Sequence, residues 1–283
     1  MDTNGPITSL YKYCPVKSDT HLKKEYSVKN LLKHRAAFSS RKNFNDLFDS
    51  QVNFIPPTKE ELKAVLEGLP QRKKKAFKHD YLTGHLKGRL NKFEKIISNT
   101  LDSYLFYCVT TKATSNLMWA HYASNHTGFC IEWDSTHIKA EQMDYEKKIA
   151  QIKLIDWIKR EAEGKSADED QKRFIRALCV KLKEWRYESE YRLLLGEDMD
   201  SPIKKREENF TLVEYPPQWI KSIIWGCRST DKTKAYIREH LPQYKYREAY
   251  LDLKNSQICI RDEKPVWRAQ PLVSKQTPEP SIS

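Results

Sequence analysis

The chain is predicted to fold as an α+β domain, because its strand-like and helix-like segments follow one another without the regular βαβ order of a doubly wound sheet. Its 283 residues are 39% hydrophobic and 11% aromatic, enough to build one large core. Glycine is scarce, at 8 residues, and neither a GxGxxG nor a GxxxxGK[ST] motif occurs. A Rossmann-type dinucleotide site and a P-loop are therefore not expected.

The first hundred residues alternate between short strands and helices. Residues Ser9–Cys14 alternate in polarity with a period of two, which is typical of a half-buried strand. Thr58 and Glu61 have the spacing of a capping box, which predicts a helix start. The elements expected here are strands over Ser9–Cys14 and Ala36–Ser40, helices over 28–35 (capped by Ser27), 58–68 and 81–99, a loop over 41–57 and a basic connector between the last two helices.

The rest of the chain is richer in strand-like segments. Aromatic and β-branched residues fill 104–110, and Ser115 can cap the helical run that follows. Phe174, Leu178 and Leu182 recur at helical spacing and predict a helix that leads into a strand around Glu188. The expected elements are strands over 104–110, 128–133, 149–157, 188–195, 220–225 and 249–260, helices over 115–123 and 174–185, and a polar loop over 161–171.

A single catalytic-type domain is expected over 9–262, with a basic helical insertion at about 58–100 and a flexible, proline-containing tail over 263–283. The net charge is +12, and between Lys59 and Ser98 there are 11 Lys and Arg against 5 Asp and Glu. Such an excess favours a nucleic acid as partner, although basic surfaces also serve solubility alone. The residues expected to bind it are Arg72, Lys73, Lys74, Lys75 and Lys78.

Cysteine usage and hydropathy indicate the compartment. The 6 cysteines are scattered without a CxxC pair, so no structural zinc site is expected. The N-terminus has no apolar signal region, and no run reaches the roughly 18 apolar residues of a membrane span. A reduced, cytoplasmic protein without a membrane partner is expected.

Glu188 and Glu190 form the most informative pair in the sequence. On a strand their side chains point to the same face, and like charges held so close repel one another. Arg186 and Arg192 share this face and could neutralise them as a surface charge cluster. The alternative is a pair kept for chemistry, as an acid and a base, as metal ligands, or as a ribose-orienting glutamate with a helper.

A second group joins the end of a strand to the helix that follows it. Thr110 and Thr111 end the strand, and His121 and Tyr122 lie on the helix capped by Ser115. Such a junction can place polar groups at a cleft. The alternative is that these side chains are exposed or satisfied by structural hydrogen bonds.

Two further groups are weighed in the same way. Tyr11 and Tyr13 share one face of the first strand and Lys12 takes the other, so the tyrosines either stack on a base or nicotinamide ring or fill the core. Asp46 and Asp49 offer oxygen ligands for Mg²⁺, but such loop residues more often form turn hydrogen bonds. No metal site is assigned.

Four motifs follow one another along the chain. They are Leu10-Tyr11-Lys12-Tyr13, Phe44-Asn45-Asp46-Leu47-Phe48-Asp49, Met118-Trp119-Ala120-His121-Tyr122-Ala123 with Gly128-Phe129, and Trp185-Arg186-Tyr187-Glu188-Ser189-Glu190-Tyr191-Arg192. With these motifs in this order, the chain resembles a bacterial family known only as a domain of unknown function, over roughly Leu10–Tyr250. It departs from that family at Leu47, where proline is commoner, and at Cys14, where a basic or hydroxyl residue is commoner.

More distantly, the same plan is similar to the ADP-ribosyltransferases, including the DarT-like toxins that modify nucleic acids. The resemblance implies a split, bent mixed β-sheet with helical insertions and a central cleft that holds NAD without a Rossmann motif. It implies that Glu190 is the catalytic glutamate and that Glu188 orients or deprotonates the acceptor. Many members carry Arg or His in the first motif, where this chain offers Lys12. The residues expected to contact NAD are Tyr11, Lys12, Tyr13, Thr110, Thr111, His121 and Tyr122.

The expected function is transfer of ADP-ribose from NAD to a macromolecular acceptor, with nucleic acid favoured. The resemblance suggests a bacterial toxin or anti-phage protein that an antitoxin or regulatory protein controls. Two alternatives stay open. One is a metal-dependent nuclease that uses Asp46, Asp49, Glu188 and Glu190, and the other is a non-catalytic module that binds nucleic acid or protein through its tyrosines and basic helices.

Overall fold

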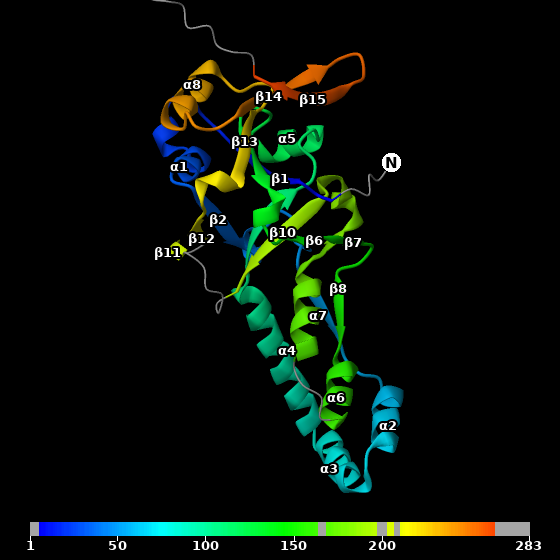
Figure 1. Cartoon of the computed structure of the whole chain (residues 1–283). Helices are drawn as coiled ribbons and strands as arrows, with labels where there is room; N and C mark the ends of the chain where they lie inside the picture. Colours follow the sequence, from blue (N-terminus) through cyan, green and yellow to red (C-terminus); the bar gives the residue numbers. More distant parts are fainter. Residues whose placement is uncertain (1–5, 164–167, 197–202, 207–209, 264–283) are drawn as a thin grey trace, which may run out of the picture.

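The computed structural model describes residues 6–163, 168–196, 203–206 and 210–263. They form a curled mixed β-sheet, like half of a barrel, with helices against it and a helical arm extending from one end (Figure 1). This mixture confirms the α+β class. None of the helices in the described part of the chain has the length and apolar character that crossing a bilayer requires. The predicted tail lies outside the described residues, apart from Glu263.

Eleven strands form the main sheet, and nearly all of its pairings are antiparallel. They are β1 (Ser9–Cys14), β2 (Arg35–Ser40), β4 (Leu105–Thr110), β5 (Phe129–Asp134), β6 (Glu141–Gln142), β10 (Glu190–Leu195), β11 (Ile203–Arg206), β12 (Phe210–Glu214), β13 (Ile220–Trp225), β14 (Tyr246–Asp252) and β15 (Gln257–Asp262). The sheet runs β11-β12-β2-β4-β1-β5-β13-β14-β15, and β10 pairs with both β4 and β6. β13 and β14 are parallel.

The sheet divides at β4. One edge of β4 pairs with β10 along its whole length. The other edge pairs with β1 at one end, through Tyr11 and Thr110, and with β2 at the other end, through Ser39 and Phe106. β1 and β2 therefore leave the same edge of one strand in different directions, and this split positions the candidate site.

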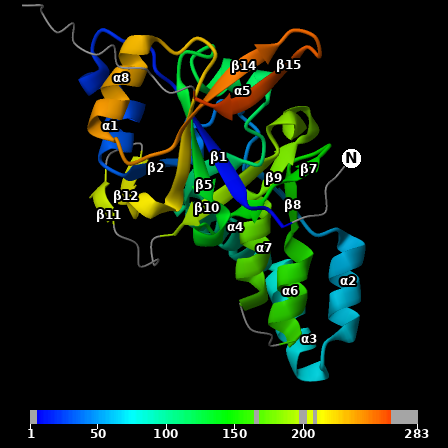
Figure 2. The same ribbon diagram turned by 45° about the horizontal axis from the view of Figure 1, so that its top comes forward.

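Helices cover both faces of the sheet. α1 (Tyr26–Leu32) and α8 (Asp231–His240) lie beside each other on one face, as both views show (Figure 1 and Figure 2). α5 (Asn116–Tyr122) packs on the other face, where the fully buried Trp119 joins an apolar cluster with Tyr13. Alternation along the strands supplies both cores, because successive side chains point to opposite faces.

The arm has an apolar core of its own. Val65, Leu90 and Ile158 are buried together in it. The predicted capping box is confirmed, since Thr58 accepts the Glu61 N–H and the Glu61 side chain accepts the Thr58 N–H. The elements of the arm are α2 (Lys59–Gly68), α3 (Gln71–Leu82), α4 (His85–Ser103), α6 (Leu154–Glu163), α7 (Asp168–Leu178) and the parallel pair β3 (Val52–Ile55) and β8 (Ala150–Lys153).

Several expected boundaries are wrong, for reasons that are local. Short apolar runs fit a strand or a buried helix equally well, so the strand expected over 149–157 is β8 followed directly by α6. The helix expected to reach Trp185 ends at Leu178, and the next residues form β9 (Val180–Leu182), which pairs with β7 (Asp144–Glu146). The other differences are β3 within the expected loop over 41–57, α3 in place of the basic connector, and Glu25 rather than Ser27 at the start of α1.

Candidate functional site

A cavity of about 430 Å³ lies where β1 and β2 diverge from β4. Those three strands, β10, α5 and the loop Asn43–Asp49 line it. Ser115 Oγ accepts the Met118 N–H at 3.3 Å, so α5 starts with the predicted cap. The predicted site residues that line this cavity are Tyr11, Lys12, Tyr13, Thr110, His121, Tyr122, Glu188 and Glu190.

A buried lysine, Lys181, gathers three carboxylates at this cavity. Its Nζ lies 2.5 Å from Glu188 Oε2, 2.8 Å from Glu190 Oε2 and 3.2 Å from Asp49 Oδ2. Burial lowers the pKa of Lys181, but the three carboxylates outweigh it and hold the pKa above its usual value. The ammonium group is therefore a fixed positive charge inside the site.

Arg192 supplies the second cation of the cluster and is fully buried. Its Nε donates to Glu190 Oε1 at 2.7 Å, and its Nη2 donates to both oxygens of Asp49 at 2.7 Å. Its Nη1 also donates to the carbonyl oxygen of Leu178 at 2.9 Å. Together with Lys181 it faces three carboxylates, so the fully ionised cluster carries a net charge of −1.

The two glutamates differ in how readily they take up a proton. Burial raises the pKa of Glu188 to about 6; Lys181 opposes this rise and the charge of Glu190 adds to it. Burial also acts to raise the pKa of Glu190, but Arg192 and Lys181 outweigh it and hold the pKa well below its usual range. Glu188 therefore titrates close to neutral pH, whereas Glu190 stays ionised.

The two glutamates do not share a strand, which corrects the argument from strand period. Glu188 is the last residue of the 3₁₀ helix Lys183–Glu188, and β10 begins at Glu190. Between them Ser189 has a φ of 46°, in the left-handed region, which ends the turn and redirects the chain. The carboxylates meet because both bind the same ammonium group. Arg186, one of the two arginines that could have neutralised them, is exposed on the turn.

Tyr122 and His121 border the cavity from α5. The Tyr122 hydroxyl donates to Glu188 Oε1 at 2.5 Å and accepts from Asn45 Nδ2 at 3.5 Å. Burial and the neighbouring Glu188 raise the pKa of Tyr122, so it remains a hydrogen-bond donor. The exposed His121 ring lies 6.1 Å from that of Tyr187. The imidazole of His121 therefore forms part of the cavity wall on the side of the solvent.

The two tyrosines of the first strand have different surroundings. Tyr13 is buried, donates to the carbonyl oxygen of Lys112 at 2.8 Å and meets the Trp119 ring edge-on at 4.9 Å. It therefore also fills the core. Tyr11 is half-buried, and its hydroxyl donates to Glu132 Oε1 at 3.4 Å.

Backbone contacts hold Lys12 and Thr110 in the cavity wall. Lys12 Nζ donates to the carbonyl oxygen of Cys108 at 2.9 Å. Thr110 Oγ1 donates to the carbonyl oxygen of Glu188 at 2.5 Å, which ties the end of β4 to the glutamate turn. Thr111 is half-buried next to it and is not among the described residues that line the cavity.

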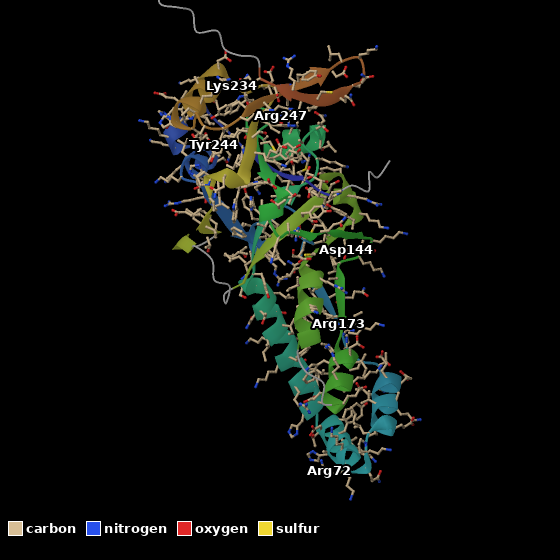
Figure 3. All side chains as sticks on the ribbon, in the orientation of Figure 1. Arg72, Asp144, Arg173, Lys234, Tyr244 and Arg247 are labelled. Carbon is tan, nitrogen blue, oxygen red and sulfur yellow. The ribbon has the colours of Figure 1, made fainter. Side chains whose placement is uncertain are left out.

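The predicted nucleic-acid contacts and the two aspartates lie in different places. Asp49 belongs to the buried charge cluster, whereas Asp46 Oδ1 accepts the Phe48 N–H at 2.9 Å in a turn. Arg72 marks the far end of the arm (Figure 3), away from the cavity in the sheet. The basic residues of α3, all exposed except the half-buried Lys74, are Arg72, Lys73, Lys74, Lys75 and Lys78.

Sequence reasoning missed two residues that organise the cluster. Lys181 lies between Val180 and Leu182, and a charged residue within an apolar run is only a weak signal of a buried ion pair. Tyr145 accepts the N–H of Glu190 on its hydroxyl at 2.8 Å and so fixes the start of β10. Neither residue lies in the four motifs.

Comparison with known proteins gives one match. The model of a family described as a protein of unknown function, DUF2971, matches residues 118–193. This segment of the chain, which is similar to that family, begins in α5 and extends into β10, so it contains Lys181 and both glutamates. No curated protein matches the chain, and no solved structure does.

Proposed function

We propose that the chain is an ADP-ribosyltransferase-like enzyme that uses NAD as substrate. One observation carries the proposal: Tyr11, Thr110 and Glu190 are direct cross-strand partners on three adjacent strands. All three line the cavity at the split of the sheet. These are the first-motif, second-motif and catalytic positions that the resemblance to ADP-ribosyltransferases implies.

The charge cluster gives each glutamate a distinct role in this reaction. Departure of nicotinamide breaks the bond to ribose C1′ and leaves an oxocarbenium-like centre, which a permanently ionised carboxylate stabilises. Glu190 is that carboxylate, since Arg192 and Lys181 keep it charged. Glu188 takes the proton of the acceptor as the new bond to C1′ forms, and its pKa of about 6 suits a general base at neutral pH.

The acceptor in this proposal is a nucleic acid that the basic arm binds. α3 carries Arg72, Lys73, Lys74, Lys75 and Lys78 at the end of the arm, so a long polyanion could contact it while a nucleotide reaches the cavity. A toxin or anti-phage role follows from the same resemblance, with an antitoxin or regulatory protein to restrain it.

The test uses labelled NAD with DNA, RNA and protein acceptors in separate reactions. Wild type should transfer label, Glu188→Gln should lose transfer, and Glu184→Gln should not, because Glu184 is exposed on the same turn and outside the cavity. Glu188→Gln is the decisive variant, since it removes the base without leaving a buried cation unpaired. Absence of transfer to every acceptor, or full transfer by Glu188→Gln, would refute the proposal.

A metal-dependent nuclease is the second candidate, because Asp49, Glu188 and Glu190 converge, although Asp46, the fourth residue of that hypothesis, lies in a turn and does not line the cavity. The oxygens of the three converging residues, however, surround the Lys181 ammonium, which occupies the position between them. Cleavage of nucleic acid that needs Mg²⁺, proceeds without NAD and is lost in Glu188→Gln would favour the nuclease over the transferase.

A further inference from the structure

A second cavity, of about 550 Å³, lies between the arm and the sheet and shares none of its lining with the candidate site. Phe93 of α4 and all four residues of β8 line it. The remaining lining comes from side chains of α6 and α7 and from the ribbon of β7 and β9. Two of its lining residues, Arg173 on α7 and Asp144 on β7, lie along the same flank of the molecule (Figure 3).

The lining of this cavity is cationic. Lys153, Arg160, Arg173 and Arg176 line it, against two carboxylates, Asp144 and Asp156. Arg173 lies 3.5 Å from Asp156, in a solvent-exposed pair that contributes little stability. Within the described part of the chain, Lys153 and Arg176 have no side-chain ion pair or hydrogen bond. Lys153 and Arg176 are thus available to an anion, and Arg173 is available once it leaves its exposed pair with Asp156.

The cavity also has an aromatic lining, next to these cations. Phe93 and Trp157 stack on one another with ring centroids 4.6 Å apart and an interplanar angle of 22°. Phe174 lines the cavity from α7, and Ile152 completes the apolar surface from β8. Flat apolar surface beside guanidinium groups suits a ligand that combines a planar ring with phosphate, because arginine binds phosphate through paired N–H donors.

We infer that this cavity binds a nucleoside phosphate, with the base against the aromatic lining and the phosphate at Arg173 and Arg176. The cavity is within the size range of small-ligand pockets, roughly 300–1,000 Å³. This site does not depend on the proposed transferase reaction. A free nucleotide and the end of a nucleic-acid strand present the same chemistry, and they are distinguished by experiment.

The cavity lies directly behind the charge cluster. β7 and β9 form a two-stranded ribbon with Asp144 opposite Val180 and Tyr145 opposite Lys181. The first pair lines the new cavity, while Tyr145 and Lys181 contact the glutamates of the candidate site. A ligand in this cavity therefore touches the other side of the ribbon that positions the site.

The test is isothermal titration of the full chain with adenosine monophosphate and, separately, with hexathymidylate. The double variant Arg173→Ala with Arg176→Ala should weaken binding about tenfold or more, and Lys153→Ala, on a different element, should weaken it less. The matched control is Lys159→Ala with Lys172→Ala, which removes the same charge from exposed positions of α6 and α7 outside the cavity. The control should bind like wild type.

Each outcome of the titration supports or refutes the proposed nucleotide site. Binding of the mononucleotide identifies a free nucleotide as ligand, and binding of the oligonucleotide alone identifies a strand end. Failure of wild type to bind either probe overturns the proposal. So does binding that the double arginine variant retains while circular dichroism shows it folded, or binding that the control loses equally, which would indicate diffuse electrostatic attraction.

Discussion

Glu188→Gln and Glu190→Gln should have opposite effects on stability at pH 8, although the two substitutions are chemically identical. Glu188 is the carboxylate in excess, since the cluster has a net charge of −1 and its folded-state pKa is about 6 rather than 4.5. Ionising it in the folded state therefore costs about 2 kcal/mol more than ionising it in the unfolded chain. A neutral glutamine of the same shape avoids that cost, so this variant should be as stable as wild type or up to about 2 kcal/mol more stable.

The pH dependence of the free energy of unfolding shows the direction in which each glutamate acts. Because the pKa of Glu188 is higher in the folded state, that state binds more protons between pH 4.5 and pH 6. Ionisation of Glu188 should therefore lower the stability of wild type relative to Glu188→Gln as pH rises through this window. Glu190 behaves in the opposite way: its lowered pKa contributes stability that is present above its unfolded pKa and disappears as pH falls.

Removing Glu190 should cost about 3–5 kcal/mol at pH 8, because Arg192 and Lys181 would lose a buried partner. The assay is urea unfolding followed by circular dichroism from pH 4.5 to pH 8, with the exposed Glu184→Gln as control. The electrostatic account is refuted if Glu188→Gln changes stability equally at both ends of this range, or if it destabilises the fold as much as Glu190→Gln at pH 8.

Four other substitutions test the charge cluster, the arm and two glycine positions. Lys181→Met should cost about 3–5 kcal/mol at pH 8 and less at pH 5, where a glutamate can take up a proton, as urea unfolding would measure. Thr58→Ala removes the capping box of the arm and should cost about 1 kcal/mol in the same assay. Gly128→Ala should lower the melting temperature sharply, because its Cβ would lie 2.1 Å from the Cys14 carbonyl oxygen, whereas Gly88→Ala, with nothing within 4 Å in α4, should be neutral or stabilising.

Local sequence patterns predicted the elements that have a regular alternation of polarity or a capping motif. β1 is the strand expected from its alternation, and α2 begins at the capping box. α3 was missed because none of its residues is buried, so no apolar period marks it as a helix. The end of the 3₁₀ helix before β10 was missed for a different reason: Ser189 adopts a left-handed conformation that is uncommon for serine and leaves no pattern in the sequence.

The sequence indicated which residues line the candidate site, but not how their charged side chains pair. The transferase hypothesis requires Tyr13, Thr110, His121 and Glu190 to share a cleft, and all four line one cavity. Arg192 lies two residues from Glu190 and was weighed as its neutralising partner, whereas the third carboxylate of the cluster comes from long-range packing, which spacing does not reveal. This carboxylate, Asp49, reaches Arg192 from 143 residues away.

The ribbon of β7 and β9 lies between the charge cluster of the candidate site and the second cavity. Because strand side chains alternate, Lys181 faces the glutamates while its neighbour Val180 faces the second cavity. Lys181 holds Glu188 Oε2 at 2.5 Å and opposes the rise in its pKa, so a movement of β9 away from the cluster would weaken that contact and raise the pKa of Glu188 further. In the proposed reaction Glu188 acts as a base and must be ionised, so a further rise in its pKa would favour the protonated, inactive form. A ligand of the second cavity that displaced β9 would therefore change the protonation of Glu188 without any contact with the glutamate.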